Sequence, residues 1–265
     1  MTYSRRIVVT GASGGIGRAI AQRFTRDGAL VANLELQPGA EAEALCGPNL
    51  RTIGVDFADA DSITAAFAAV DTLFGQPPDG LVCCAAISAA HPFLDVPTDV
   101  LDRLLAVNVR GTFLACQAAA RRMRTVGRGH IVVITSVAAD QAWAGEMVYG
   151  ATKAAQRALV QGMAVELAPF GILVNAVGPG IVEHRSTSMA RTRDDPEVHQ
   201  HDLDRTPLAR FGAPEEIADA VHFLTSVTWM TGQTIYVDGG FLASGLAYFG
   251  QARARITGEL TPPSR

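Results

Sequence analysis

Short apolar runs rich in β-branched residues alternate along this chain with segments of helical periodicity. Ile16, Ala19, Ile20 and Phe24 illustrate the second kind, because their spacing places four apolar side chains on one face of a helix. Alternating strands and helices predict a parallel sheet covered by helices on both faces, with right-handed crossovers. The seven runs expected to form strands are 7–9, 30–34, 52–55, 80–84, 130–135, 172–176 and 234–237.

Length and composition indicate one domain. The 265 residues are 48% hydrophobic and 18% charged, which is enough apolar material for one large buried core. No linker, repeat or low-complexity segment divides the chain, so we expect a single doubly wound α/β domain over 1–265. The net charge is −4 and the basic residues are scattered, which argues against nucleic acid or an anionic membrane as a partner.

The ends and the cysteines bear on the compartment. The first six residues lead directly into an apolar run without a signal-peptide core, and no apolar stretch approaches the ~18–20 residues of a membrane span. Cys46, Cys83, Cys84 and Cys116 show no spacing typical of metal ligands. We therefore expect reduced thiols, no metal and a cytoplasmic protein.

A glycine-rich turn follows the first apolar run. Residues 10–17 read Thr-Gly-Ala-Ser-Gly-Gly-Ile-Gly and open a predicted helix. Such a turn lets the backbone approach a pyrophosphate and points helix amide groups at the anion, although a purely structural turn is the alternative. Glu35 ends the second run, where a carboxylate can accept hydrogen bonds from ribose hydroxyls and repel a 2′-phosphate, unless it is only a solvated acid.

Ser136, Tyr149 and Lys153 form a second constellation. Lys153 follows Tyr149 by four residues, so both lie on one helix face. A tyrosine has a pKa of about 10, and an ammonium ~5 Å away at an effective dielectric of ~20 contributes about 3 kcal/mol, or ~2 pKa units. Tyr149 would then titrate near ~7–8 and serve as an acid–base group, while Ser136 holds a substrate oxygen.

Together these motifs resemble the short-chain dehydrogenase/reductase family over nearly the whole chain. The resemblance implies a seven-stranded Rossmann fold, NAD as cofactor, a small alcohol or ketone as substrate and a homotetramer. It adds Asn108 as part of a proton relay that reaches Lys153 through water, which makes Asn108, Ser136, Tyr149 and Lys153 the expected catalytic residues. The expected cofactor contacts are Gly11, Ser13, Gly14, Gly15, Ile16, Gly17, Glu35, Asp56, Phe57, Ala85, Ala86, Tyr149, Lys153, Pro179, Gly180 and Val182.

The chain departs from the family pattern at several positions. Cys83-Cys84-Ala85-Ala86 stands where the family has Asn-Asn-Ala-Gly, which bears on how the sheet and the cofactor loop are braced. His184 replaces a threonine beside the nicotinamide and is either a hydrogen bonder at the base of a lid or a substrate contact. Gly14 and Leu36 stand where NADP-using members carry a base, so the sequence offers no positive charge for the phosphate.

Two segments complete the expected site. The polar stretch 184–210 is interpreted as a mobile lid, within which His199 and His201 are read as loop residues and not as metal ligands. The tail 241–265 begins with apolar and aromatic residues and is expected to pack against a neighbouring subunit. Substrate contacts are expected from Ser88, His91, Phe93, Gln141, Trp143, Glu146 and His184.

The leading hypothesis is an oxidoreductase that transfers a hydride between NAD(H) and a secondary alcohol or ketone. A 3-oxoacyl-carrier-protein reductase is the alternative within this class, but it requires NADPH and a base near Gly14 or Leu36. A non-catalytic NAD-sensing regulator is the alternative from another class, but such proteins tend to lose the tyrosine or the lysine, and this chain keeps both.

Overall fold

The computed structural model describes residues 4–37, 47–183 and 194–244 and shows one parallel sheet. Its seven strands run in the order β3-β2-β1-β4-β5-β6-β7. The chain thus builds one half of the sheet outward from β1 and then returns to build the other half from β4. The strands are β1 (Arg6–Thr10), β2 (Leu30–Glu35), β3 (Leu50–Gly54), β4 (Gly80–Cys83), β5 (Gly129–Ile134), β6 (Ile172–Pro179) and β7 (Thr234–Val237).

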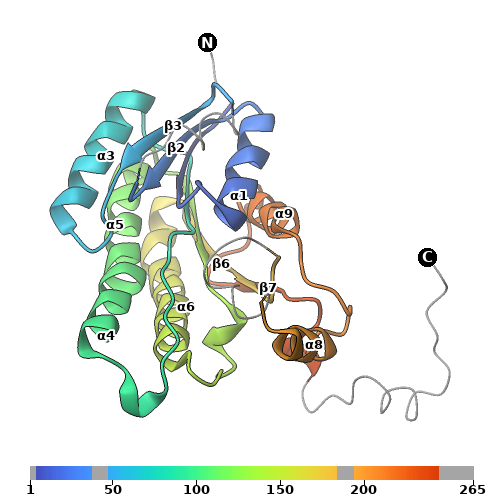
Figure 1. The fold of residues 1–265 in the computed structure, drawn as a ribbon. Coiled ribbons are helices and arrows are strands. Elements are labelled where there is room, and N and C mark those ends of the chain that lie inside the picture. The colour runs from blue at the N-terminus through green and yellow to red at the C-terminus, as the bar shows by residue number, and fades with distance from the viewer. Residues whose placement is uncertain (1–3, 38–46, 184–193, 245–265) are drawn as a thin grey trace, which may run out of the picture.

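Helices cover both faces of the sheet, as expected for βαβ crossovers (Figure 1). One face carries α3, α5 and α6 around a core that includes Phe67 and Met123, and the other carries α1 and α9 around Ile20 and Val221. The doubly wound α/β prediction is confirmed. The helices are α1 (Gly15–Arg26), α3 (Ala60–Phe74), α4 (Thr98–Leu104), α5 (Thr112–Met123), α6 (Met147–Leu167), α8 (Pro196–Arg205) and α9 (Pro214–Leu224).

The first βα unit shows why the glycine-rich turn has its sequence. Gly11 has a φ of 74°, in the left-handed region that favours glycine. A Cβ on Gly17 would lie 2.1 Å from the carbonyl oxygen of Gly11, so only glycine allows α1 to start this close to β1. This close packing fixes the start of α1 directly above the end of β1.

Several details differ from the sequence expectations. Most strand ends shift by one to three residues, with β6 continuing to Pro179. The segment read as a polar loop contains α8, whose N-terminus is capped by the side chain of Asp195 and begins with Pro196, so helix-start signals were overlooked there. Phe241 is buried within its own chain, which removes it from a surface available to a second subunit. His184, Cys46 and the tail beyond 244 lie outside the described residues.

The cysteines of β4 and its neighbours lie in the core. Cys83 and Cys116 are buried free thiols whose Sγ atoms are 3.7 Å apart, and Cys84 is free and partly buried. Cys83 belongs to the core on the α5 side, whereas Cys84 packs on the α1 side, as alternation along a strand requires. No helix in the described parts of the chain is long and apolar enough to cross a membrane.

Candidate active site

A large cleft lies at the carboxyl ends of the strands, beside the point where the sheet order reverses between β1 and β4. Its volume is about 1020 Å³. Ligands of open α/β sheets bind at this place because the loops that follow β1 and β4 diverge there. All sixteen residues expected to contact the cofactor line this cleft, from the glycine loop to Pro179, Gly180 and Val182 after β6.

The glycine loop has the features of an anion cradle. Gly14 precedes α1 without a side-chain cap, and the first turn of α1 carries no acidic residue. The first amide groups of α1 therefore keep their capacity to bind an anion. Within the described part of the chain, a Cβ on Gly14 would meet nothing within 4 Å, and the buried Ser13 Oγ has no hydrogen-bond partner. These residues fit the pyrophosphate of a dinucleotide.

Buried side chains from neighbouring strands hold this loop. Asn33 on β2 accepts a hydrogen bond from Ala12 N at 2.9 Å. Thr10 Oγ1 accepts from Cys84 N at 3.0 Å and from Ala85 N at 2.9 Å, which joins the loops after β1 and β4. Part of the bracing questioned by the loss of the family asparagines is thus supplied by Thr10 and Asn33, which sequence reasoning missed.

The ribose end of the cleft carries charges of both signs. Glu35 Oε2 accepts a hydrogen bond from Ser13 N at 3.2 Å, which holds the carboxylate against the glycine loop. Arg18 on α1 donates to Ser13 O and lines the same cleft, as does Arg103, which lies 3.7 Å from Asp56. Arg18 and Arg103 therefore bring positive charge to this cleft that the positions of Gly14 and Leu36 did not indicate.

Ser136 and Tyr149 meet at the floor of the cleft. Ser136 follows β5 and accepts a hydrogen bond from Ala138 N at 3.1 Å, which starts the turn η4 (Val137–Ala139). A Cβ on Gly150 would lie 2.9 Å from Ala138 O, so a glycine after Tyr149 lets α6 approach this turn. The approach brings the Ser136 hydroxyl close to Tyr149, where it favours the ionised form of the tyrosine.

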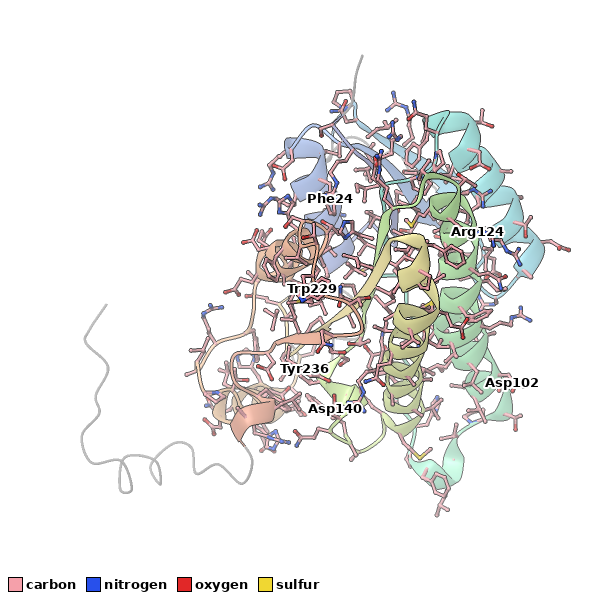
Figure 2. The ribbon with its side chains drawn as sticks, turned by 180° about the vertical axis from the view of Figure 1, so that it is seen from behind. Phe24, Asp102, Arg124, Asp140, Trp229 and Tyr236 are labelled. Carbon is pink, nitrogen blue, oxygen red and sulfur yellow. The ribbon has the colours of Figure 1, made fainter. Side chains whose placement is uncertain are left out.

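The turn after Ser136 is anchored from its far side. Tyr236 on β7 donates a hydrogen bond to the carboxylate of Asp140, and Arg157 on α6 forms an ion pair with the same carboxylate. Figure 2 shows Asp140 and Tyr236 at the same end of the sheet. This anchor joins β7, η4 and α6 and fixes the segment that carries Ser136.

Lys153 lies one helical turn beyond Tyr149, and its Nζ is 5.5 Å from the centroid of the tyrosine ring. The side chain is 2% exposed, and Nζ donates to Ile134 O at 2.9 Å and to Gln156 Oε1 at 3.0 Å. An ammonium has three donors, so one remains for a partner in the cleft. Burial lowers the pKa of Lys153 to about 8.

The pKa of Tyr149 differs from the expected value. Burial raises it above the ordinary value of a tyrosine, and the hydrogen bond from Ser136 opposes this only in part. The expectation of a lowered pKa counted the attraction of Lys153 but not the loss of hydration at the floor of a deep cleft. In the protein alone Tyr149 is therefore a phenol at neutral pH.

Asn108 does not reach Lys153 through its side chain. It lies in the π-helical turn η2 (Leu105–Gly111), where its Oδ1 accepts from Ile87 N at 2.9 Å and its Nδ2 donates to Ile87 O at 2.8 Å. Its main-chain carbonyl accepts a hydrogen bond at 2.7 Å from Gln156, the residue that also contacts Lys153. The link between Asn108 and Lys153 was expected to run through water. It includes the side chain of Gln156, which sequence reasoning missed.

Comparisons with known proteins agree with this geometry. A family model described as enoyl-(acyl carrier protein) reductase matches residues 11–242. L-rhamnose 1-dehydrogenase (NAD(P)(+)) of Azotobacter vinelandii is 36% identical over 257 residues, covering 92% of this chain and 99% of the relative. L-xylulose reductase of Mesocricetus auratus is 39% identical over 246 residues, covering 91% and 97%. A short-chain type dehydrogenase/reductase from Mycobacterium ulcerans superimposes with a TM-score of 0.84 at 32% identity, covering 91% of this chain and 90% of that one.

The chain belongs to the short-chain dehydrogenase/reductase family. It is an oxidoreductase that uses a nicotinamide cofactor and interconverts a secondary alcohol and a ketone. The cleft of this short-chain dehydrogenase/reductase accordingly has two ends, the glycine loop for the dinucleotide and the Ser136–Tyr149 floor.

The substrate side of this short-chain dehydrogenase/reductase has an aromatic wall. Trp143 and Glu146 line the cleft, and the Trp143 ring stacks on Phe241 with centroids 5.5 Å apart. Ser88 also lines it. Among the described residues, the expected substrate contacts His91, Phe93 and Gln141 do not line the cleft. His/Cys/Asp/Glu side chains do not gather into a metal-binding group in the described ranges.

Proposed function

We propose that this protein is an NAD-dependent dehydrogenase/reductase in which Tyr149 is the acid–base residue. The observation that carries the proposal is the meeting of Ser136, Tyr149 and Lys153 on the floor of the same cleft that the glycine loop opens. This places a hydroxyl that can hold an oxygen, a phenol that can exchange a proton and a buried cation within one site.

The roles follow from the protonation of each group. When a ketone is reduced, the Tyr149 phenol donates its proton to the carbonyl oxygen, which Ser136 holds by a hydrogen bond. In oxidation, the tyrosinate accepts the proton of the substrate hydroxyl. Lys153 is protonated near neutral pH, because its pKa is about 8, and its charge favours the tyrosinate. A nicotinamide bound in the cleft supplies the hydride donor or acceptor.

We propose NAD as the preferred cofactor because of Glu35. Its carboxylate is held beside Ser13, where it can accept hydrogen bonds from ribose hydroxyls and repel a phosphate. Arg18 lines the same end of the cleft and acts in the opposite direction, by favouring an anion. Glu35 is the stronger argument, because the repulsion between a carboxylate and an adjacent 2′-phosphate outweighs the attraction of a partly hydrated guanidinium.

We propose a polyhydroxylated alcohol or its ketone as substrate. Trp143 offers a flat apolar face for the carbon side of such a molecule, and its buried Nε1 has no hydrogen-bond partner among the described residues. Glu146 and Ser88 add polar groups in the same part of the cleft. The relatives named L-rhamnose 1-dehydrogenase, L-xylulose reductase and D-erythrulose reductase support this substrate class.

Assembly, lid and compartment complete the proposal. A homotetramer is supported by Leu105 and Phe113, which are exposed on a shallow apolar groove of about 420 Å³ beside Leu159 of α6.

The segment 184–210 is proposed as a substrate lid, since α8 carries Arg205 over the ring of Phe241 next to Trp143. A cytoplasmic location is supported by two free thiols 3.7 Å apart, which suit a reducing compartment.

A panel of sugars, polyols, hydroxy esters and simple secondary alcohols tests the function. Each is assayed with NAD and with NADP by nicotinamide absorbance, with the matching ketones and the reduced cofactors in the reverse direction. Turnover of at least one polyol with NAD, and weaker turnover of monohydric alcohols, is the expected result. Dinucleotide binding without turnover of any substrate would favour a sensing regulator, and turnover confined to thioester ketones with NADPH would favour an acyl-carrier reductase.

A further inference from the structure

Gln156 is a fully buried polar side chain that the proposed mechanism does not use. It lies on α6 three residues after Lys153, on the same helix face, and is 1% exposed. A buried carboxamide costs stability unless its oxygen and its two N–H groups are satisfied. Its partners therefore show what this position contributes.

The hydrogen bonds of Gln156 use the full polarity of the carboxamide. Oε1 accepts from Lys153 Nζ at 3.0 Å. Nε2 donates to Asn108 O at 2.7 Å and to Thr112 Oγ1 at 2.9 Å. The reversed amide would place its NH₂ group against the ammonium and its oxygen against the Asn108 carbonyl, so these partners fix one orientation.

This network joins the catalytic helix to the π-helical turn that carries Asn108. The lysine ammonium has two protein acceptors, Ile134 O on β5 and Gln156 Oε1, which lie on different elements. Two acceptors of fixed direction restrain a flexible side chain and leave its third donor in the cleft.

We propose that Gln156 is a positioning residue for Lys153: its carboxamide ties the ammonium to the main-chain carbonyl of Asn108 and fixes the place from which the ammonium acts on Tyr149 and on a bound dinucleotide. The inference rests on the proposed function and goes beyond it, because a neutral side chain provides the link for which a water-mediated relay was expected. Gln156 transfers no proton itself. It holds the group that sets the charge at the site.

The surroundings make the charge of this bridge important. The ionisable groups that face Lys153 are Tyr149 on α6, the thiol of Cys83 at the end of β4 and the thiol of Cys84 just after it, and Glu146 faces Tyr149. Burial raises the pKa of Cys84 to about 12, and the contact with Cys116 together with burial raises that of Cys83, so both thiols are neutral near neutral pH. A neutral amide stabilises the ammonium without cancelling its charge, whereas a carboxylate at this place would form an ion pair with it.

Three variants of the full chain test the proposal. Gln156→Met keeps the shape of the side chain and removes its hydrogen bonds, and Gln156→Glu places a carboxylate beside Lys153. The matched control is Val160→Ala, a buried change one turn further along α6 that removes no hydrogen-bonding group. For each protein we would measure the melting temperature, the fluorescence-detected Kd of NADH between pH 6 and pH 10, and the pH profile of kcat and kcat/KM.

NADH binding is expected to weaken at the pH where Lys153 loses its proton. Gln156→Met is expected to lower kcat roughly tenfold and to move this weakening to lower pH, because the ammonium loses an acceptor. Gln156→Glu is expected to move it to higher pH by about one unit or more, because a carboxylate stabilises the ammonium. Val160→Ala should lower only the melting temperature. If Gln156→Met does not fold, Gln156→Asn takes its place with the same expected direction.

Wild-type pH profiles in both Gln156 variants, with only a lower melting temperature, would overturn the proposal and leave Gln156 as a packing residue. NADH binding requires no alcohol, so the two hypotheses fail separately. Shifted NADH profiles without turnover of any alcohol by the wild type would leave the link between Gln156 and Lys153 in place and remove the proposed catalytic roles. Turnover of an alcohol by the wild type, with unshifted NADH profiles in the variants, would support the proposed catalytic roles and remove the link between Gln156 and Lys153.

Discussion

Lys153 Nζ lies 5.5 Å from the centroid of the Tyr149 ring, one helical turn away on α6. Unit charges at this separation attract each other by about 3 kcal/mol at an effective dielectric of ~20. Burial opposes both charges, since it lowers the pKa of Lys153 to about 8 and raises that of Tyr149. We therefore expect the charge on one side chain to influence the ionisation of the other.

The rate in each direction should report this pair. Oxidation needs the tyrosinate, so its rate should rise with pH, whereas reduction needs the phenol and should fall over the same range. Lys153→Met removes the cation that favours the tyrosinate, so the rise in oxidation should move to higher pH, with weaker cofactor binding. Profiles of kcat/KM in both directions check this. A rise at the same pH in wild type and variant would show that Lys153 does not influence the ionisation.

Tyr149→Phe should separate chemistry from binding. It removes one hydroxyl from the floor of the cleft, so the fold and dinucleotide binding should persist while turnover falls by roughly 10²- to 10⁴-fold. Thr64→Val is the control, because it removes a hydroxyl on α3 that contacts Ala60 O and does not line the cleft. Its effect on turnover should be far smaller. Near wild-type turnover in Tyr149→Phe would end the catalytic assignment.

Cofactor preference should depend on Glu35. The wild type is expected to favour NAD, and Glu35→Ala combined with Leu36→Arg should shift preference toward NADP by removing repulsion and adding a phosphate partner. Arg18 lines the same end of the cleft, so the single change Glu35→Ala should already improve use of NADP. The ratio of kcat/KM values for the two cofactors measures both effects. Equal ratios in wild type and double variant would contradict the role of Glu35.

The sequence predicted most of what depends on local pattern. Period and composition located the seven strands, and the spacing of Tyr149 and Lys153 placed both on one face of α6. The partners that hold these groups were missed, because they come from elements distant in the chain. Gln156 contacts Asn108 across 48 positions, and Asn33 contacts Ala12 across 21. The raised pKa of Tyr149 was missed for a related reason, since burial is set by packing and not by spacing.

Closure of the segment 184–210 should be visible by hydrogen exchange. Arg205 of α8 lies over Phe241, whose ring stacks on Trp143 in the cleft wall, so a substrate against Trp143 should reach α8 through this stack. Peptides from the segment should gain protection when cofactor and a substrate analogue are both present, and less with cofactor alone. Peptides from α3 provide the control. Unchanged protection in the segment would argue against a lid.

Glu216 should make stability depend on pH at the N-terminus of α9. Its Oε2 accepts from Ala213 N at 2.7 Å, and its carboxylate forms an ion pair with Arg210, which lowers its pKa to about 2. A carboxylate whose folded pKa lies below its unfolded value of about 4.3 stabilises the fold above that value and loses this contribution as pH falls toward 2.

Because the ion pair is exposed, we expect Glu216→Gln to lower the free energy of unfolding by only about 0.5–1 kcal/mol at pH 7. The difference in unfolding free energy from urea titrations should shrink from pH 5 toward pH 2, whereas the surface control Glu215→Gln should show little difference at pH 7. A Glu216→Gln difference that stays constant over this range would mean that the cap acts through its shape and not its charge.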